Sequence, residues 1–150
     1  MRGQAATEYI IMFAVVVIIA LIVAGALGGF PTISGGIGER ESSAYWTTAP
    51  IAISKHHISL NSSKSLLVFR NNQNYPVFLE RAKFNGAELI IGRTLYPGSS
   101  VEVDGGNSVW CPLQVSKYYF NVTIYYTDLE SGGELSFRGE RPLVGVCEGT

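Results

Sequence analysis

The order of apolar and polar positions divides the chain into two parts with different periods. An uninterrupted apolar run extends from Ile10 to Leu27 after a polar start. With Tyr9 it is about 19 residues long, enough to cross the hydrocarbon of a bilayer as a helix. Two glycines and Pro31 follow the run, and these residues end helices. The pattern predicts a hydrophobic helix of transmembrane length over residues 4–27.

Further along the chain, polar and apolar residues alternate in short runs, which is typical of half-buried strands. The Asn85-Gly86 pair between two such runs favours a tight hairpin turn. The runs lie at residues 51–60, 65–70, 77–84, 87–95, 100–103, 117–126, 134–138 and 143–146. Short strands with regular turn signals predict an all-β, immunoglobulin-like sandwich over residues 50–150. The predicted fold class is α+β, a long N-terminal hydrophobic α-helix followed by this β head.

The run at 117–126 is aromatic and β-branched and is predicted as a central strand. Alternation assigns one set of its side chains to the core: Tyr118, Phe120, Val122, Ile124 and Tyr126. It assigns the other set to the outer face: Tyr119, Asn121, Thr123 and Tyr125. Exposed tyrosines would suit contacts between heads or stacking on sugars, but a half-buried outer sheet is the interpretation that we favour.

The segment between helix and head, residues 28–49, is predicted as a linker. It contains a glycine-rich stretch and then a polar stretch, Glu39-Arg40-Glu41-Ser42-Ser43. An ordered connection that packs on a neighbouring element is the alternative, because Phe30, Ile33 and Ile37 are apolar.

Glu8 is the acid at the edge of the apolar run. A carboxylate beside hydrocarbon is costly unless it has a partner, so its position indicates a function. A plain alternative is that Glu8 lies at the positive end of the helix dipole.

The apolar segment as a whole has an alternative too, a secretory signal cleaved after Ala26, with Ala24-Gly25-Ala26 as the small-x-small site. Arg2 before the run places the N-terminus in the cytoplasm.

The polar start, the acid and the helix together resemble the class III signal of archaeal type IV pilins. The family pattern has a glutamine, a serine two positions later, a glutamate two after that and a leucine four further on. The corresponding residues here are Gln4, Ala6, Glu8 and Met12, of which the glutamine and the glutamate are identical. The resemblance covers about the first 30 residues, from Arg2-Gly3-Gln4 through the apolar run.

This resemblance implies cleavage between Gly3 and Gln4 by a membrane-embedded prepilin peptidase, with residues 1–3 as the leader peptide. The helix would remain on the mature subunit and bundle with other copies in a filament core. Glu8 would pair with the α-amine of Gln4 in a neighbouring subunit, unless Gln4 cyclises and loses its charge. Assembly would require a membrane platform and a cytoplasmic ATPase.

Two further pairs of residues fit an extracytoplasmic head. Cys111 and Cys147 are the two cysteines of the chain, and outside the cytoplasm such a pair predicts a disulfide. The sequons at Asn61 and Asn121 license N-glycosylation where the side chains are exposed. Asn61 falls in a predicted turn and is the better site, whereas Asn121 lies in the aromatic strand.

Few residues point to chemistry. His56 and His57 are adjacent, so on a strand they face opposite sides and cannot easily bind one ion. Neither a phosphate-binding loop nor a nucleophile elbow accompanies them. We predict no enzymatic activity, no catalytic or metal-binding residue and no cofactor. With 11 basic and 12 acidic residues the net charge is −1, so nucleic acid is not indicated as a partner.

We therefore expect a structural subunit of an extracellular type IV pilus-like filament, inserted in the cytoplasmic membrane as a precursor. The helix would form the filament core by self-association, and the β head would form the exterior and serve adhesion or surface attachment. Two alternatives stay open. One is a membrane-anchored surface binding protein, and the other is a minor pilin that does not itself form the bulk filament.

Overall fold

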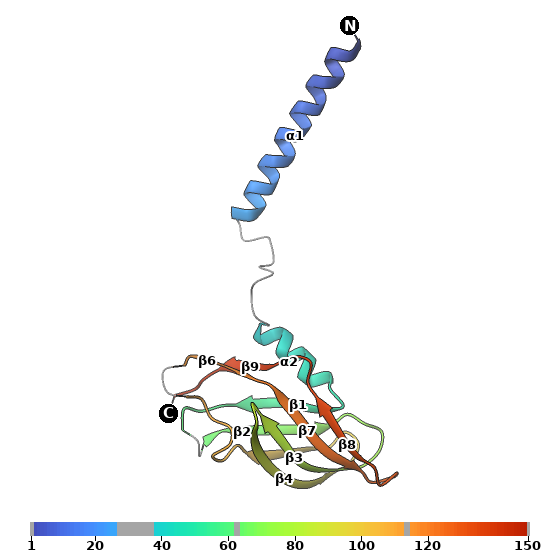
Figure 1. Cartoon of the computed structure of the whole chain (residues 1–150), viewed down its shortest axis with the longest axis vertical. Coiled ribbons are helices and arrows are strands. Elements are labelled where there is room, and N and C mark those ends of the chain that lie inside the picture. Colours follow the sequence, from blue (N-terminus) through green and yellow to red (C-terminus); the bar gives the residue numbers. More distant parts are fainter. Residues whose placement is uncertain (1, 27–37, 62–63, 113–114, 150) are drawn as a thin grey trace. The chain divides into compact units, whose positions relative to one another are not determined.

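A computed structural model describes residues 2–26, 38–61, 64–112 and 115–149 of the chain (Figure 1). The chain divides into two compact units, Met1–Gly36 and Ile37–Thr150. The first unit contains helix α1, Arg2–Ala26, which covers nearly all of the helix predicted over residues 4–27. Within α1, Ala6–Val23 is long and apolar enough to cross a membrane.

The second unit begins with a helix that the sequence analysis did not predict. Helix α2, Glu39–Thr48, lies inside the expected linker, of which residues 28–37 are outside the described part of the chain. Ser42, Trp46 and Ala49 are buried at helical spacing, so this segment has an inward face. The linker prediction is therefore wrong for residues 39–48, because these residues pack on the head.

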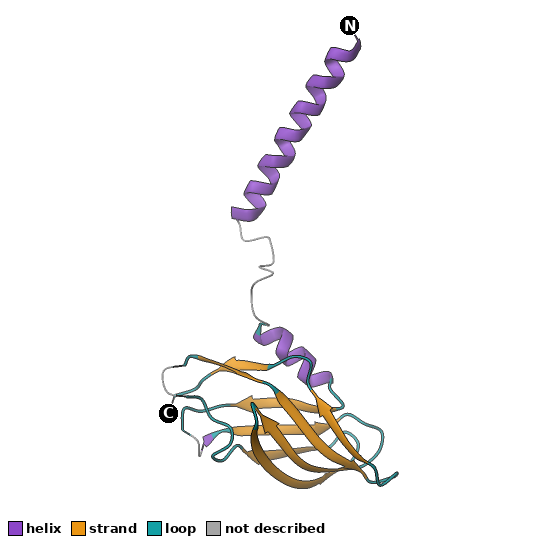
Figure 2. Cartoon of the chain, viewed as in Figure 1, coloured by secondary structure: helices purple, strands orange, loops and turns teal. Residues whose placement is uncertain are grey.

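Nine strands follow in the described part of the head (Figure 2). They are β1 (Ile51–His57), β2 (Leu66–Asn71), β3 (Val77–Phe84), β4 (Ala87–Leu95), β5 (Ser100–Asp104), β6 (Lys117–Phe120), β7 (Val122–Asp128), β8 (Glu134–Arg138) and β9 (Leu143–Val146). A three-stranded sheet has the order β1-β2-β5, a four-stranded sheet the order β4-β3-β7-β8, and a two-stranded sheet pairs β6 with β9. All these pairs are antiparallel, so the fold is α+β with an N-terminal apolar helix and a mostly β body.

The strand predicted over residues 117–126 is two strands in the structure. β6 pairs with β9, whereas β7 lies between β3 and β8, and the change of partner takes place at Asn121. The predicted alternation of side chains is confirmed on both sides of this break. The inward set is buried: Tyr118, Phe120, Val122, Ile124 and Tyr126. The outward set is exposed or half-buried.

One hydrophobic core joins all parts of the head. It contains Phe69 from the three-stranded sheet, Ile124 from the four-stranded sheet, Leu143 from the two-stranded sheet and Trp46 from α2. Burying a large apolar side chain completely contributes about 1.5–3 kcal/mol, so this cluster is the main source of stability.

Helix α2 is also held to the sheets by polar contacts. The Ser42 hydroxyl donates to the Pro142 carbonyl (2.9 Å) and accepts from the Val144 N–H (2.8 Å). At the other end of α2, the Asn72 side chain donates to the carbonyls of Thr47 (2.8 Å) and Ala49 (2.9 Å). These bonds satisfy carbonyls at the helix end and an N–H at the edge of β9.

Candidate functional site

The Ala6–Val23 span of helix α1 is strongly apolar, and none of it is buried among the residues that the structure describes. Its described large apolar side chains are exposed, among them Ile10, Phe13 and Ile22. Contiguous apolar surface of this kind is covered by lipid, by other proteins or by copies of the same chain. The α1 surface is therefore the first candidate functional site.

Glu8 lies at the polar end of this span and is exposed. Because α1 begins at Arg2, no acidic residue lies in its first turn, and Glu8 comes one turn later. Helix-dipole stabilisation declines beyond the first turn, so the dipole accounts poorly for an acid at this position. Gly3 and Gln4 are within α1, and the contacts of their side chains lie outside what the structure describes.

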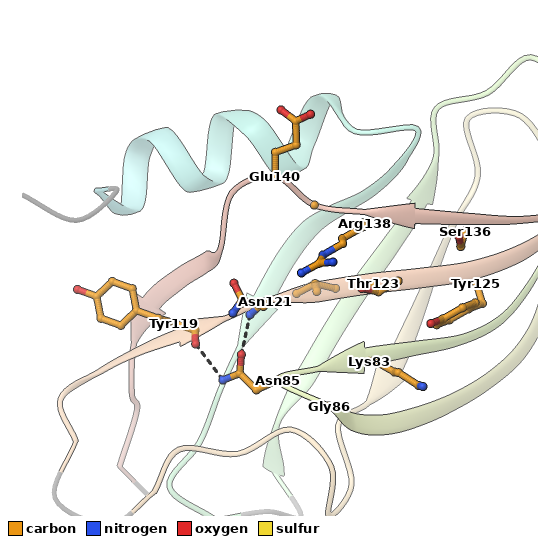
Figure 3. A pocket seen from close by; sticks show the side chains of 12 residues that line it. Lys83, Asn85, Gly86, Tyr119, Asn121, Thr123, Tyr125, Ser136, Arg138 and Glu140 are labelled. Atoms are coloured by element: carbon orange, nitrogen blue, oxygen red, sulfur yellow. Dashed lines mark hydrogen bonds between the residues drawn. The ribbon is translucent and has the colours of Figure 1, made fainter.

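A second candidate site is an open groove on the outer face of the four-stranded sheet. It encloses about 1250 Å³ next to the break between β6 and β7. Figure 3 shows Tyr119 and Tyr125 toward opposite ends of the groove, with Thr123 and Arg138 between them. Asn121, the second sequon asparagine, is exposed in the middle of this lining.

The hairpin turn between β3 and β4 fixes the shape of the groove. Asn85 has the positive φ of 50° that the predicted Asn-Gly turn requires. Its side chain donates to the Tyr119 carbonyl (3.0 Å) and accepts from the Asn121 N–H (2.7 Å). Its own N–H donates to the Asn121 carbonyl (3.0 Å). Three hydrogen bonds thus hold the break between β6 and β7 to this turn.

The groove carries two cations and one acid among its lining residues: Lys83, Arg138 and Glu140. Lys83, Thr123 and Arg138 are neighbours across β3, β7 and β8. Beside them, the Arg81 guanidinium lies 4.7 Å from the centre of the Tyr125 ring, and the Lys83 ammonium lies 5.6 Å from it. These cation–π contacts hold both cations at the outer face of the sheet.

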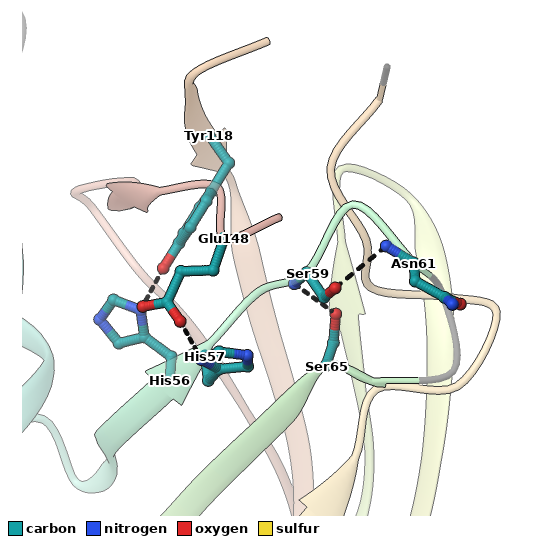
Figure 4. Close-up of polar contacts among 7 residues, drawn as sticks. All are labelled: His56, His57, Ser59, Asn61, Ser65, Tyr118 and Glu148. Carbon is teal, nitrogen blue, oxygen red and sulfur yellow. Dashed lines mark hydrogen bonds and ion pairs between the residues drawn. The ribbon is translucent and has the colours of Figure 1, made fainter. Parts of the chain in front are cut away.

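The adjacent histidines form separate contacts, as Figure 4 shows. His56 Nδ1 is hydrogen-bonded to the Tyr118 hydroxyl, and His57 Nδ1 lies 2.6 Å from a Glu148 carboxylate oxygen. Burial lowers the pKa of His56 more than the nearby Glu39 raises it. Burial, with Glu39 and Glu148, raises the pKa of Tyr118. The two rings connect β1 to β6 and to the C-terminal segment, which is a structural role.

Among the residues that the structure describes, no three His, Cys, Asp or Glu side chains are grouped as ligands for a metal ion. Cys111 and Cys147 form a disulfide that joins the loop after β5 to the residue directly after β9, with 6.0 Å between their Cα atoms. Cys111 is fully buried. The pair predicted from the sequence is therefore bonded in the structure.

The first sequon asparagine, Asn61, is exposed, and its N–H donates to the Ser59 hydroxyl (3.0 Å). The two residues that complete this sequon, 62 and 63, are outside the described part of the chain. In the second sequon, Asn121 and Thr123 both belong to the outward set of side chains. Both predicted asparagines thus present accessible side chains.

The groove was not predicted from the sequence. Alternation placed Tyr119, Asn121, Thr123 and Tyr125 on the outer face, but it gave no sign of the neighbouring strands. Lys83 and Arg138 are 55 positions apart and meet only because β7 lies between β3 and β8. The signal that could have found helix α2 is the spacing of Ser42, Tyr45, Trp46 and Ala49, which is that of one helical face.

In comparisons with known proteins, no family model, curated protein or solved structure matches this chain. The resemblance to archaeal type IV pilins therefore depends on the N-terminal residues.

Proposed function

We propose that the chain is a structural subunit of an extracellular type IV pilus-like filament, in which α1 forms the core and the β head forms the exterior. The observation that carries the proposal is the apolar span Ala6–Val23, which is not buried among the described residues and contains the carboxylate of Glu8 near its start. Bundled copies of α1 would cover this surface, and Glu8 would need a cationic partner there. The α-amine of Gln4 in a neighbouring subunit is that partner.

Several parts of the proposal follow from the resemblance. A prepilin peptidase would remove residues 1–3, and a membrane platform with a cytoplasmic ATPase would assemble the subunits. The precursor would be held in the cytoplasmic membrane by α1, and the filament would serve adhesion or surface attachment. The exposed side chain of Asn61 supports a glycosylated head, and Asn121 is a second candidate acceptor.

The proposal includes an immunoglobulin-like sandwich as the class of the head. Its support is that a three-stranded and a four-stranded antiparallel sheet contribute to one core. A membrane-anchored surface protein remains the alternative function, because the same apolar span suits lipid as well as helices. A minor pilin would have the same surface and would differ in abundance.

The decisive experiment is mass spectrometry of the N-terminal peptide in material sheared from the cell surface. A sheared chain that begins at Gln4 supports a processed filament subunit, and it also reveals whether Gln4 has cyclised. A chain with intact Met1 that is recovered only from membranes would refute the filament and support the membrane-anchored surface protein.

A pair of variants tests the role of the acid. Glu8→Gln keeps the size of the side chain and removes its charge, so filaments should be lost or misregistered in electron micrographs. Glu102→Gln is the matched control, because Glu102 is an exposed acid on β5. Normal filaments from the Glu8→Gln variant would refute the proposed pairing of Glu8 with the α-amine of Gln4.

A further inference from the structure

We infer that the groove beside β6 and β7 is a binding site for an acidic saccharide, with Lys83 and Arg138 as its carboxylate-binding cations. The inference rests on the proposed function only in placing the head outside the cell, where such saccharides are found. It assigns a ligand class to the adhesive face of the head.

The charges of the groove fit an anion. Neither Lys83 nor Arg138 has an ion pair in the described part of the chain, whereas Arg81 is paired with Glu88 at 3.5 Å. Lys83 and Arg138 lie on either side of Thr123, two strand spacings apart, which is about 10 Å between their backbones. Glu140 at the rim leaves a net lining charge of +1, since two cations stand against one acid. Two cations whose charge is not neutralised by an ion pair in the described part of the chain suit carboxylates on successive parts of one ligand.

The uncharged lining residues fit a sugar. Tyr119 is 51% exposed, so one part of its ring is available to stack on the apolar face of a pyranose. Asn121, Thr123 and Ser136 supply amide and hydroxyl groups that both donate and accept hydrogen bonds. From Tyr119 to Tyr125 the chain advances six residues, at most about 20 Å when extended. The groove therefore suits an oligosaccharide better than a single sugar.

The groove is also preorganised. The three hydrogen bonds of Asn85 fix the backbone at Tyr119 and Asn121, and the Tyr125 ring holds the Lys83 ammonium by its cation–π contact. A site that is already ordered loses less conformational entropy on binding. The polar lining argues against an apolar protein surface as the ligand, because interface centres are depleted in charge.

Asn121 adds a consequence of its own. A glycan on this asparagine would project from the middle of the groove, so modification of Asn121 and binding of an outside saccharide exclude each other. The test therefore uses full-length chain from a host without N-glycosylation, purified in a nonionic detergent.

The experiment measures binding of an oligogalacturonate by isothermal titration calorimetry, with a neutral galactose oligomer of the same length as the second probe. The wild-type chain should bind the acidic probe at least tenfold more tightly than the neutral one. The double variant Lys83→Gln/Arg138→Gln should lose at least tenfold in affinity for the acidic probe. Tyr119→Ala should weaken both probes, because stacking does not depend on the carboxylates.

The matched control is Lys55→Gln/Arg70→Gln, which removes two exposed cations from the three-stranded sheet and changes the net charge equally. Its affinity should equal that of the wild type. Equal losses in the two double variants, equal affinity for the two probes, or no binding at millimolar oligogalacturonate would each overturn the inference. If binding fails but the wild-type chain forms filaments on the cell surface, the inference is wrong and the proposed function stands. If the chain binds the acidic probe specifically but forms no filaments, the proposed function is wrong and the inference stands.

Discussion

Replacement of Ser42 by alanine tests whether α2 is part of the head. The Ser42 hydroxyl is buried and makes two hydrogen bonds, with the Pro142 carbonyl and the Val144 N–H. Each such bond contributes about 1 kcal/mol net, and a buried donor left without a partner costs about 1–3 kcal/mol. We therefore expect Ser42→Ala to lower the free energy of unfolding by about 2–4 kcal/mol.

The assay is urea unfolding of the full-length chain in a nonionic detergent, followed by tryptophan fluorescence, because Trp46 is buried in the folded head and becomes exposed on unfolding. Ser43→Ala is the matched control, since Ser43 is exposed on the same helix and should change stability by less than about 0.5 kcal/mol. Equal midpoints for the two variants would refute the reasoning, because the contact of α2 with β9 would then contribute nothing measurable.

Four other predictions follow from the packing of the head. Gly145→Ala should cost about 1–3 kcal/mol of unfolding free energy, because the added Cβ would overlap the Tyr118 ring; a circular dichroism melt measures it. Reduction of the disulfide, which closes a 36-residue separation, should cost about 4 kcal/mol in the chain-entropy model, as measured by urea unfolding with and without reductant. Burial lowers the pKa of His56 below its ordinary 6.5, so the unfolded chain binds more protons and stability should fall as the pH drops below 6.5. His56→Gln should make the melting temperature depend less on pH in this range. A chain that starts at Ile37 should keep the melting temperature of the full chain. A chain that also lacks α2, with its buried Trp46, should lose about 3–5 kcal/mol of unfolding free energy and melt at a lower temperature. Equal melting temperatures for these two truncations would contradict the place of Trp46 in the hydrophobic core.

Local patterns predicted the elements whose causes are local. The apolar run predicted α1, and the Asn85-Gly86 pair predicted the hairpin between β3 and β4. Alternation predicted which side of residues 118–126 is buried, because a side chain's face depends only on its position along the extended chain. The exchange of strand partners at Asn121 has no local sign, since it depends on where β9 and β3 lie.

Helix α2 was not predicted, because its composition is that of a linker although the spacing of its apolar residues is helical. Its sequence is polar and follows a glycine-rich stretch, so it resembles a linker by composition. Its stability comes from Trp46 in the core and from Ser42 at the edge of β9, and these are tertiary contacts. The groove has the same origin, because its cations come from strands separated along the chain and joined by the sheet.

The contacts of β9 bear on how a head of this kind would resist force. Under the proposed function, tension on the filament would reach the head through α2, the first element after α1 in the described chain. Ser42 fastens α2 to β9 at Val144, and Cys147 directly after β9 fastens that strand to Cys111. β9 is thus tied on one side by hydrogen bonds and on the other by a covalent bond. Without the disulfide, the removal of β9 by tension on α2 would be opposed by the pairing with β6, by the burial of Leu143 and Val144, and by the backbone hydrogen bonds of Glu148. The covalent bond adds to these contacts at the strand that would carry the load.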